Sequence, residues 1–458
     1  MRGIKLSELK LFLNQVRERS RKVPDFLKEF LGEIYSQILI EASQGDFSFI
    51  PLEHNISISH PIKNPGENIV PRKRVQREFS NQLLENSIAI DAGYLGPEGF
   101  TEKDGIVSLS GVLFRKNVGI KRFRQSFLLK PGFRSEHLFV MGAFELDFAR
   151  LLMFWAKEGE IVESNVLNWQ EYGIETKKML NNYFLDLKEK ENLIITLDRP
   201  IFPYYLYGYE SISKNVLIKA YNELFLAWEK TNIPVYSVIS ASTQKSILKV
   251  LLEIINGDNL SGTQIIIDFI HQWLKSNIDK ALSILNHSLE HVNIEEESFV
   301  FPKDQETMTS LLYAILHEKL MDGTPYLKDF DVIKYSKLGY GDRSTAWTLN
   351  SSKLNDPKSL FIKELAGNSL LSFFYVSFGG NDYSRIEFLG DTPWLPYIHY
   401  LYMCSINSIN YPFHLDLAHR VSVMDKSIKK GYLSILHRFT GSVAGSKFRS
   451  KVGGVIYA

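Results

Sequence analysis

The sequence predicts an α/β protein in which a mixed sheet is flanked by helices. Two apolar strands, residues 87–90 and 193–197, each run into an aspartate and a turn, at Asp91 and Asp198. The segment between them predicts two further strands, at residues 105–114 and 121–129, and then two helices. A further helix and strand follow within residues 215–240, and a hairpin is predicted at residues 373–388. This order is typical of a layered α/β fold, because parallel strands need helical crossovers.

The composition sets broad limits on function. A chain of 458 residues, 45% hydrophobic and 23% charged, can build a large core and more than one domain. Its net charge of +1 gives no overall attraction to nucleic acid, so such a partner would need a local basic face. We expect a cytoplasmic protein with no membrane partner, since we see no signal peptide and no apolar run as long as a membrane span. The single cysteine, Cys404, excludes an internal disulfide, and its apolar helical setting indicates a buried structural thiol.

Three segments are predicted along the chain. Residues 1–80 form a helical N-terminal arm and a basic linker, residues 81–440 form the main domain with a helical insertion at about 245–320, and residues 441–458 form a basic tail. Candidate phosphate contacts lie in the linker, in a strand at residues 121–129 and in the tail: Arg72, Lys73, Arg74, Arg122, Arg124, Lys447, Arg449 and Lys451. A solvated, solubilising role is the alternative for these side chains.

Asp91 and Asp198 are candidate site residues because each carboxylate follows an apolar strand. Burying an unpaired charge costs on the order of several kcal/mol, so a carboxylate at the end of a core strand indicates a metal or catalytic site. If the two strands are neighbours, the two carboxylates lie side by side. The alternative for Asp91 is a structural role in capping the following turn.

Other candidates lie on predicted helices. Helices at residues 137–157 and 174–190 carry Glu145 and Glu175, each a candidate for an inward-facing acid. His419 lies two turns into a helix that Pro412 starts. A lone histidine on a helix is either a structural residue or a ligand.

A zinc peptidase is a competing hypothesis. Residues 287–291 read His-Ser-Leu-Glu-His, which fits the pattern in which two histidines on one helical face hold zinc and the glutamate acts as base. Glu364 is the candidate for the third ligand. The pattern is short and its neighbours are polar, so a solvated helix surface is the preferred interpretation.

The order of motifs along the chain resembles the NurA family of nucleases. It comprises the two strands ending in Asp91 and Asp198, Gly-Asp-Arg-Ser at residues 341–344, a Phe-Tyr strand, Arg-Ile-Glu at residues 385–387 and a Tyr-Pro…Ala-His-Arg helix. The resemblance covers roughly residues 86–440. It implies an RNase H-like core that binds two divalent cations, usually manganese and otherwise magnesium. It also implies a homodimer that cuts DNA while docked on a HerA hexameric ATPase.

The resemblance assigns residues as well. Asp91 and Asp198 match the two strand-end aspartates, His419 matches the helical histidine, and Tyr411 matches the tyrosine before it. Tyr411 either orients the scissile phosphate or packs. The family's glutamate lies on the helix before the second aspartate strand, so Glu175 has the better topological place and Glu145 is the alternative.

The residue types suit this chemistry. Phosphodiester hydrolysis uses cations about 3.5 to 4 Å apart, held by oxygen ligands, and an imidazole ligand favours manganese over magnesium. Two departures from the family pattern stand out: Ala92 follows Asp91, and Arg199 follows Asp198, where glycines are expected. Arg199 either pairs with a metal ligand or contacts DNA.

Two functions from different classes therefore follow. The first is a metal-dependent deoxyribonuclease, exonucleolytic or endonucleolytic, in DNA end processing and repair. The second is a NurA-like adaptor that has lost catalysis and binds the translocase or DNA without cutting.

Overall fold

The computed structural model describes residues 25–52, 86–95, 105–115, 119–129, 137–159, 193–208, 212–240, 242, 244–256, 268, 272, 327–336, 338–350, 352, 357–378, 382–407 and 410–423. The chain divides into two compact units. Unit 1 comprises Met1–Asn68, Ala241–Lys353 and Tyr375–Ser384, and unit 2 comprises Ile69–Ser240, Leu354–Phe374 and Arg385–Ala458.

A mixed sheet forms the centre of unit 2. Five of its strands lie wholly in unit 2: β2 (Asn86–Leu95), β3 (Gly105–Arg115), β4 (Gly119–Leu129), β5 (Leu193–Leu197) and β6 (Val235–Ser240). Two more, β8 (Leu371–Ser377) and β9 (Tyr383–Leu389), contribute Leu371–Phe374 and Arg385–Leu389 to this unit. They lie in the order β8-β9-β6-β5-β2-β3-β4. The pairs β2–β5 and β5–β6 are parallel, whereas β2–β3 and β3–β4 are antiparallel. The predicted mixed α/β architecture is confirmed.

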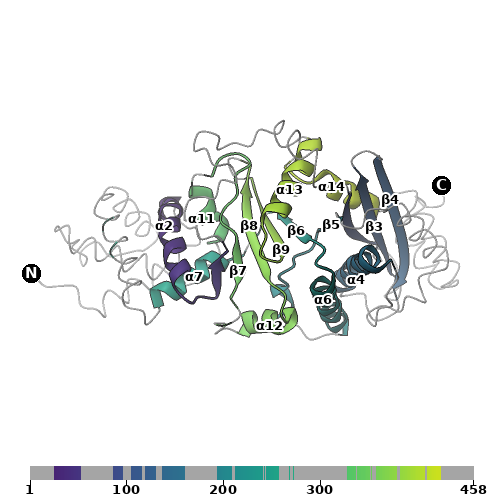
Figure 1. Ribbon diagram of the computed structural model, residues 1–458, viewed down its shortest axis with the longest axis horizontal. Coiled ribbons are helices and arrows are strands. Elements are labelled where there is room, and N and C mark those ends of the chain that lie inside the picture. The colour runs from purple at the N-terminus through teal and green to yellow at the C-terminus, as the bar shows by residue number, and fades with distance from the viewer. Residues whose placement is uncertain are drawn as a thin grey trace, which may run out of the picture. The chain divides into compact units, whose positions relative to one another are not determined.

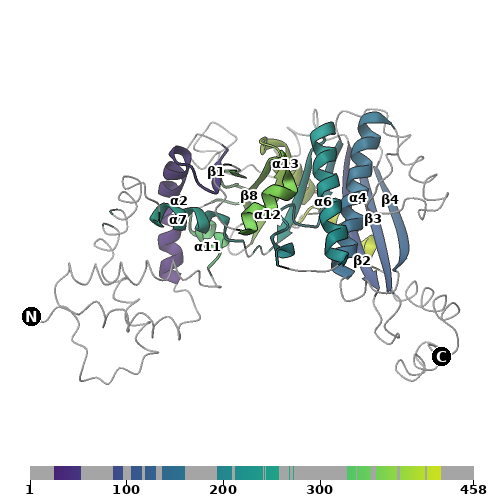
Figure 2. The same cartoon turned by 90° about the horizontal axis from the view of Figure 1, so that it is seen from below.

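Helices cover both faces of this sheet. The remaining elements of unit 2 are α4 (His137–Glu158), the short 3-10 helix η3 (Tyr204–Leu206), α6 (Ile212–Thr231), α12 (Pro357–Ala366), α13 (Trp394–Asn407) and α14 (Phe413–Ser422). Helices α4 and α6 run side by side in both views (Figures 1 and 2). The ring of Phe148 in α4 lies over Gly111, while the adjacent Ser110 contacts Ala418 of α14. Because successive strand residues face opposite ways, α4 and α14 cover opposite faces of β3.

Two buried histidines join α13 and α14 to the sheet. His399 and His414 are both fully buried, with ring centroids 5.2 Å apart. Nδ1 of His399 lies 2.7 Å from the Tyr236 hydroxyl, and Nε2 of His414 lies 2.9 Å from the Thr196 hydroxyl. Burial lowers the pKa of His399 to about 3 and holds the pKa of His414 well below 6.5. Both rings are therefore neutral in the folded protein at ordinary pH.

Substituting His414 by glutamine tests this assignment. Between pH 6.5 and the lowered pKa, the unfolded chain carries a proton on His414 that the folded chain lacks, so this residue costs stability as the pH falls. The free energy of unfolding of His414→Gln, relative to the original protein, should rise by about 1.4 kcal/mol per pH unit from pH 6.5 to 4.5. Denaturant titrations of both proteins at several pH values measure it. Taking the difference cancels the opposite contribution of buried carboxyl groups, and a difference independent of pH would contradict neutral burial.

Unit 1 is built on helices packed around a small sheet. Its elements are α2 (Asp25–Gln44), β1 (Phe49–Pro51), α7 (Ser246–Asn256), α11 (Asp329–Tyr335) and β7 (Trp347–Leu349). Strand β1 pairs antiparallel with β7. The buried Asp329 carboxylate accepts the backbone N–H groups of Ser246, Ile247 and Leu248, which have no partner within α7. Asp329 therefore caps α7 from another part of the chain.

Several sequence predictions are confirmed by these elements. The strands predicted near residues 105–114 and 121–129 are β3 and β4, and the predicted hairpin near residues 373–388 is β8–β9. Pro412 precedes α14 as its N-cap rather than lying in its first turn. The boundaries at 80 and 440, most of the insertion, the helix at 174–190 and the tail lie outside the described residues and stay predictions. Among the helices that the structure describes, none has the length and apolar character of a membrane span.

Candidate metal centre

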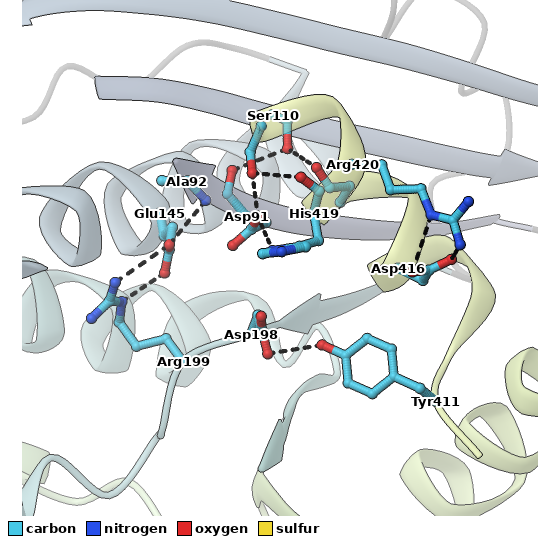
Figure 3. Close-up of polar contacts among 12 residues, drawn as sticks. Asp91, Ala92, Ser110, Glu145, Asp198, Arg199, Tyr411, Asp416, His419 and Arg420 are labelled. Carbon is cyan, nitrogen blue, oxygen red and sulfur yellow. Dashed lines mark hydrogen bonds and ion pairs between the residues drawn. The ribbon is translucent and has the colours of Figure 1, made fainter. Parts of the chain in front are cut away.

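Asp91 and Asp198 lie at the same level of two neighbouring parallel strands. Strands β2 and β5 pair in parallel with Ile90 opposite Leu197, and an aspartate follows each of these residues. The carboxyl ends of parallel strands are where α/β proteins hold their sites. Figure 3 shows the Asp91 and Asp198 side chains near each other, with His419 beside Asp91 and Tyr411 beside Asp198.

The predicted end of the first strand is wrong. Strand β2 continues past Asp91 to Leu95, and residues 91–95 pair with β3, with Asp91 opposite Ser110. The small residues Ala92 and Gly93, which suggested a turn, are ladder positions instead. Asp91 therefore does not cap a turn, and its carboxylate, only 5% exposed, projects from the middle of a core strand.

Helix α14 adds an imidazole to the two carboxylates. Nδ1 of His419 lies 3.2 Å from Oδ2 of Asp91, and the Ser110 hydroxyl, 2.8 Å from the Ala418 carbonyl oxygen, ties the helix to β3. Asp91, Asp198 and His419 each offer one ligand atom, and these atoms all lie within 4.8 Å of one another. Asp91 is buried, whereas Asp198 and His419 are exposed.

Ser422 and Gly93 hold the end of α14 against this cluster, and neither was predicted from the sequence to belong to the site. The Ser422 hydroxyl donates to Oδ2 of Asp91 at 2.5 Å. A Cβ at position 93 would lie 2.6 Å from the Ser422 carbonyl oxygen, closer than real Cβ atoms approach backbone. The glycine at position 93, one place later than the family pattern, is therefore what lets the helix reach the strand.

A methyl group at position 93 should loosen this contact. Gly93→Ala would push the end of α14 away from β2 and displace His419 from Asp91. Because the clash is with backbone, we expect a loss of about 1 to 3 kcal/mol in stability and a manganese affinity at least about tenfold weaker. Denaturant unfolding and manganese titration measure the two effects, and Gly111→Ala, which meets the Phe148 ring on the other face, is the matched control. Unchanged manganese affinity would contradict this role.

Tyr411 contacts Asp198 directly. The Tyr411 hydroxyl donates to Oδ1 of Asp198 at 2.9 Å (Figure 3). Surrounding protein and the neighbouring Asp91 carboxylate raise the pKa of Asp198 to about 6, against the lowering effect of the Tyr411 hydrogen bond. Burial and Asp198 raise the pKa of Tyr411 itself. The tyrosine therefore stays protonated and fixes the orientation of one carboxylate oxygen.

Of the two candidate glutamates, Glu145 lies beside the cluster and Glu175 lies outside the described residues. Oε1 of Glu145 accepts the Ala92 backbone N–H at 3.0 Å, and Oε2 accepts Nε–H of Arg199 at 2.6 Å. Burial raises the pKa of Glu145 to about 7 despite this ion pair. The Arg199 guanidinium pairs with a candidate ligand, which was one of its two predicted roles.

A buried ion pair anchors the loop that follows Asp198. The Glu387 carboxylate, fully buried, accepts the backbone N–H of Phe202 at 3.0 Å and pairs with Arg385 at 2.8 Å. The Tyr221 hydroxyl donates to the Pro200 carbonyl oxygen at 2.6 Å. The Arg-Ile-Glu motif thus supports the loop that presents Asp198 and Arg199.

The other candidates are placed apart from the cluster or are not described. Arg122 is exposed on β4, and Nε–H of Arg124 donates to the Ser108 hydroxyl at 3.0 Å. Glu364 is exposed on α12, and Cys404 is buried. The remaining candidates lie outside the described residues: Arg72, Lys73, Arg74, His287, His291, Lys447, Arg449 and Lys451.

The donor set suits a hard divalent cation. An ion held by three atoms at about 2.1 to 2.4 Å keeps them within about 4.2 to 4.8 Å of one another, which the cluster satisfies. Two carboxylate oxygens with one imidazole nitrogen favour manganese over magnesium or calcium. The residues present therefore fit the cation that the family resemblance implies.

No protein-family model matches the chain, and no curated protein matches it significantly. The solved structures similar to it include NurA nucleases. The NurA nuclease from Sulfolobus solfataricus is 14% identical, with 86% of this chain and 99% of that chain covered and a TM-score of 0.35. NurA with manganese is 10% identical, with 77% of this chain and 90% of that chain covered and a TM-score of 0.28. NurA bound to dAMP and manganese is 10% identical, with 80% of this chain and 93% of that chain covered and a TM-score of 0.29.

Proposed function

We propose that this protein is a divalent-metal-dependent DNA nuclease of the NurA type with an RNase H-like core. The observation that carries the proposal is the convergence of Asp91, Asp198 and His419, whose ligand atoms lie within 4.8 Å of one another. These are the residues that match the family's motifs in the sequence. Tyr411, which also matches a family motif, donates to Asp198. Glu145, the second of the two candidates for the family's glutamate, accepts the Ala92 backbone N–H.

Each residue has a defined part in phosphodiester hydrolysis. Asp91, Asp198 and His419 would hold the cation, with manganese preferred. A cation held there would supply the positive charge that activates a water and stabilises negative charge on the phosphate. Tyr411 orients Asp198 through its hydroxyl. Glu145, whose oxygens accept the Ala92 N–H and the Arg199 Nε–H, holds Arg199 beside the cluster. Ser422 fixes the Asp91 carboxylate so that it does not rotate away from its partner ligands.

The wider context of the reaction follows from the family resemblance. We infer that the protein works as a homodimer with a HerA-type hexameric ATPase in DNA end processing and repair. The DNA backbone is held by basic side chains, with Arg122 and Arg124 on β4 as the described candidates and Arg72, Lys73 and Arg74 in the linker. Cutting from an end and cutting within a strand are both compatible with this site.

Metal removal provides the test. Cleavage of a labelled linear DNA duplex should require added manganese, stop on chelation with EDTA and return when manganese is restored in excess. The assay is run with and without the partner ATPase, because activity in this family can depend on it. Manganese binding without cleavage in either case would favour the second candidate function, a non-catalytic NurA-like adaptor, and cleavage unaffected by EDTA would overturn the metal-dependent mechanism.

A further inference from the structure

The contacts of Glu145 and Arg199 indicate how many divalent cations the site binds, an inference that rests on the proposed function. The starting observation is that Glu145 is not free to bind a cation. Its carboxylate is 2% exposed, one oxygen accepts the Ala92 backbone N–H, and the other accepts Nε–H of Arg199 at 2.6 Å. A second Arg199 nitrogen lies 3.4 Å from the first oxygen. The guanidinium therefore spans both oxygens of Glu145.

The fold makes room for Arg199 in this position. Its side chain is only 12% exposed, and its guanidinium lies where a side chain at Gly142 would be. A Cβ at Gly142 would lie 2.7 to 2.8 Å from three guanidinium atoms. Glycine costs helix stability in the interior of a helix such as α4, so its presence here fits a need for space. A nearly buried arginine requires a carboxylate partner, and Glu145 supplies it.

Charge balance then favours one bound cation. Asp91, Asp198 and Glu145 carry a formal charge of −3 when a nearby cation holds them ionised. One divalent cation and Arg199 supply +3, whereas two divalent cations and Arg199 would leave the site with an excess of +2. An uncompensated charge in a partly buried site is costly.

We propose that Arg199 takes the place of a second cation, so that each chain binds one divalent cation and uses a guanidinium as the other positive charge of the site. Arginine suits this role because its guanidinium keeps its charge when it is buried in a protein. Glu145 accepts from Nε and one terminal nitrogen, and the other terminal nitrogen lies against Gly142 of α4. The arginine where the family pattern has glycine is then a functional replacement, and the sequence expectation of two cations is revised to one.

Manganese stoichiometry, measured by isothermal titration calorimetry and by electron paramagnetic resonance of free manganese, tests the proposal without any activity assay. The original protein should bind one manganese ion per chain. Arg199→Met removes the charge and frees Glu145, so a second site should appear, and Arg199→Met combined with Glu145→Gln should return the count to one. Arg199→Lys, which keeps the charge, should stay at one.

Arg420→Met is the matched control, because Arg420 lies next to His419 but is 67% exposed and pairs with Asp416 within α14. Its count should remain one. Two manganese ions per chain in the original protein would overturn the inference without contradicting the proposed nuclease function. A single ion per chain in a folded Arg199→Met would have the same consequence. If Arg199→Met does not fold, the count in the original protein decides alone. No manganese binding by the original protein would overturn the proposed function, and the inference with it.

Discussion

Replacing Asp91 by asparagine should abolish manganese-dependent DNA cleavage while leaving the fold intact. Asp91 is the buried member of the ligand cluster and the one that His419 and Ser422 both contact. Asparagine keeps the size and the acceptor for the Ser422 hydroxyl but removes the charge that binds the cation. Metal ions contribute several kcal/mol of charge stabilisation in the transition state, and a loss of about 4 kcal/mol corresponds to a rate about a thousandfold lower.

The measurement is a rate of cleavage of labelled linear duplex in manganese, with circular dichroism and unfolding curves as fold controls. Asp416→Asn is the matched substitution, since Asp416 is a half-buried aspartate on α14 that pairs with Arg420 and lies outside the cluster. It should retain most of the activity. Full activity in a folded Asp91→Asn would contradict the assignment of this cluster as the metal centre.

Truncating Glu387 to alanine should cause a large loss of stability. Arg385 and Glu387 are both fully buried, and the Arg385 guanidinium carbon lies 3.7 Å from the centroid of the Phe373 ring. Glu387→Ala would leave this charge buried without its carboxylate and release the backbone N–H of Phe202. Breaking a buried pair in this way costs about 3 to 5 kcal/mol.

Denaturant unfolding measures this loss, and a double substitution separates charge from packing. Arg385→Met combined with Glu387→Leu removes both charges and should recover much of the stability. Because Glu387 supports the loop after Asp198, Glu387→Ala should also weaken manganese binding at temperatures where the protein remains folded. A change in stability below about 1 kcal/mol would contradict the role of the pair.

The sequence was sufficient to predict the strands and the meeting of the two aspartates. Apolar runs at residues 87–90 and 193–197 predict strands, because β-branched residues favour strands. Pairing of these strands in parallel places the Asp that follows each run at the same level of the sheet. The place of His419 could be counted from Pro412 in helical turns. What these patterns share is that the information lies within a few neighbouring residues.

Contacts across the chain could not be predicted in the same way. Ser422 and Gly93 belong to the site only because α14 packs against β2. The residue pattern of neither segment predicts that contact. The end of β2 was misplaced because small residues at positions 92 and 93 resemble a turn, whereas they lie in an antiparallel ladder. A tertiary contact decided both cases.

The choice between Glu145 and Glu175 depended on which face of a helix is turned inward. Helix α4 is apolar almost all round and buried along most of its length, so its pattern does not identify one inner face. One signal was available. Asp147 and Arg150 are spaced to pair with each other, and they do so at 2.8 Å. Glu145 is then the remaining buried acid of α4, and its partner had to come from elsewhere.

The most direct test of the metal centre is to locate manganese in the molecule. Crystals soaked in manganese and measured at the manganese absorption edge should show an anomalous peak bounded by the carboxylates of Asp91 and Asp198 and the imidazole of His419. The same soak of Asp91→Asn should lose that peak. A crystal whose anomalous map shows no peak at these three residues at saturating manganese, or one only at another place, would contradict the assignment of this cluster as the catalytic centre.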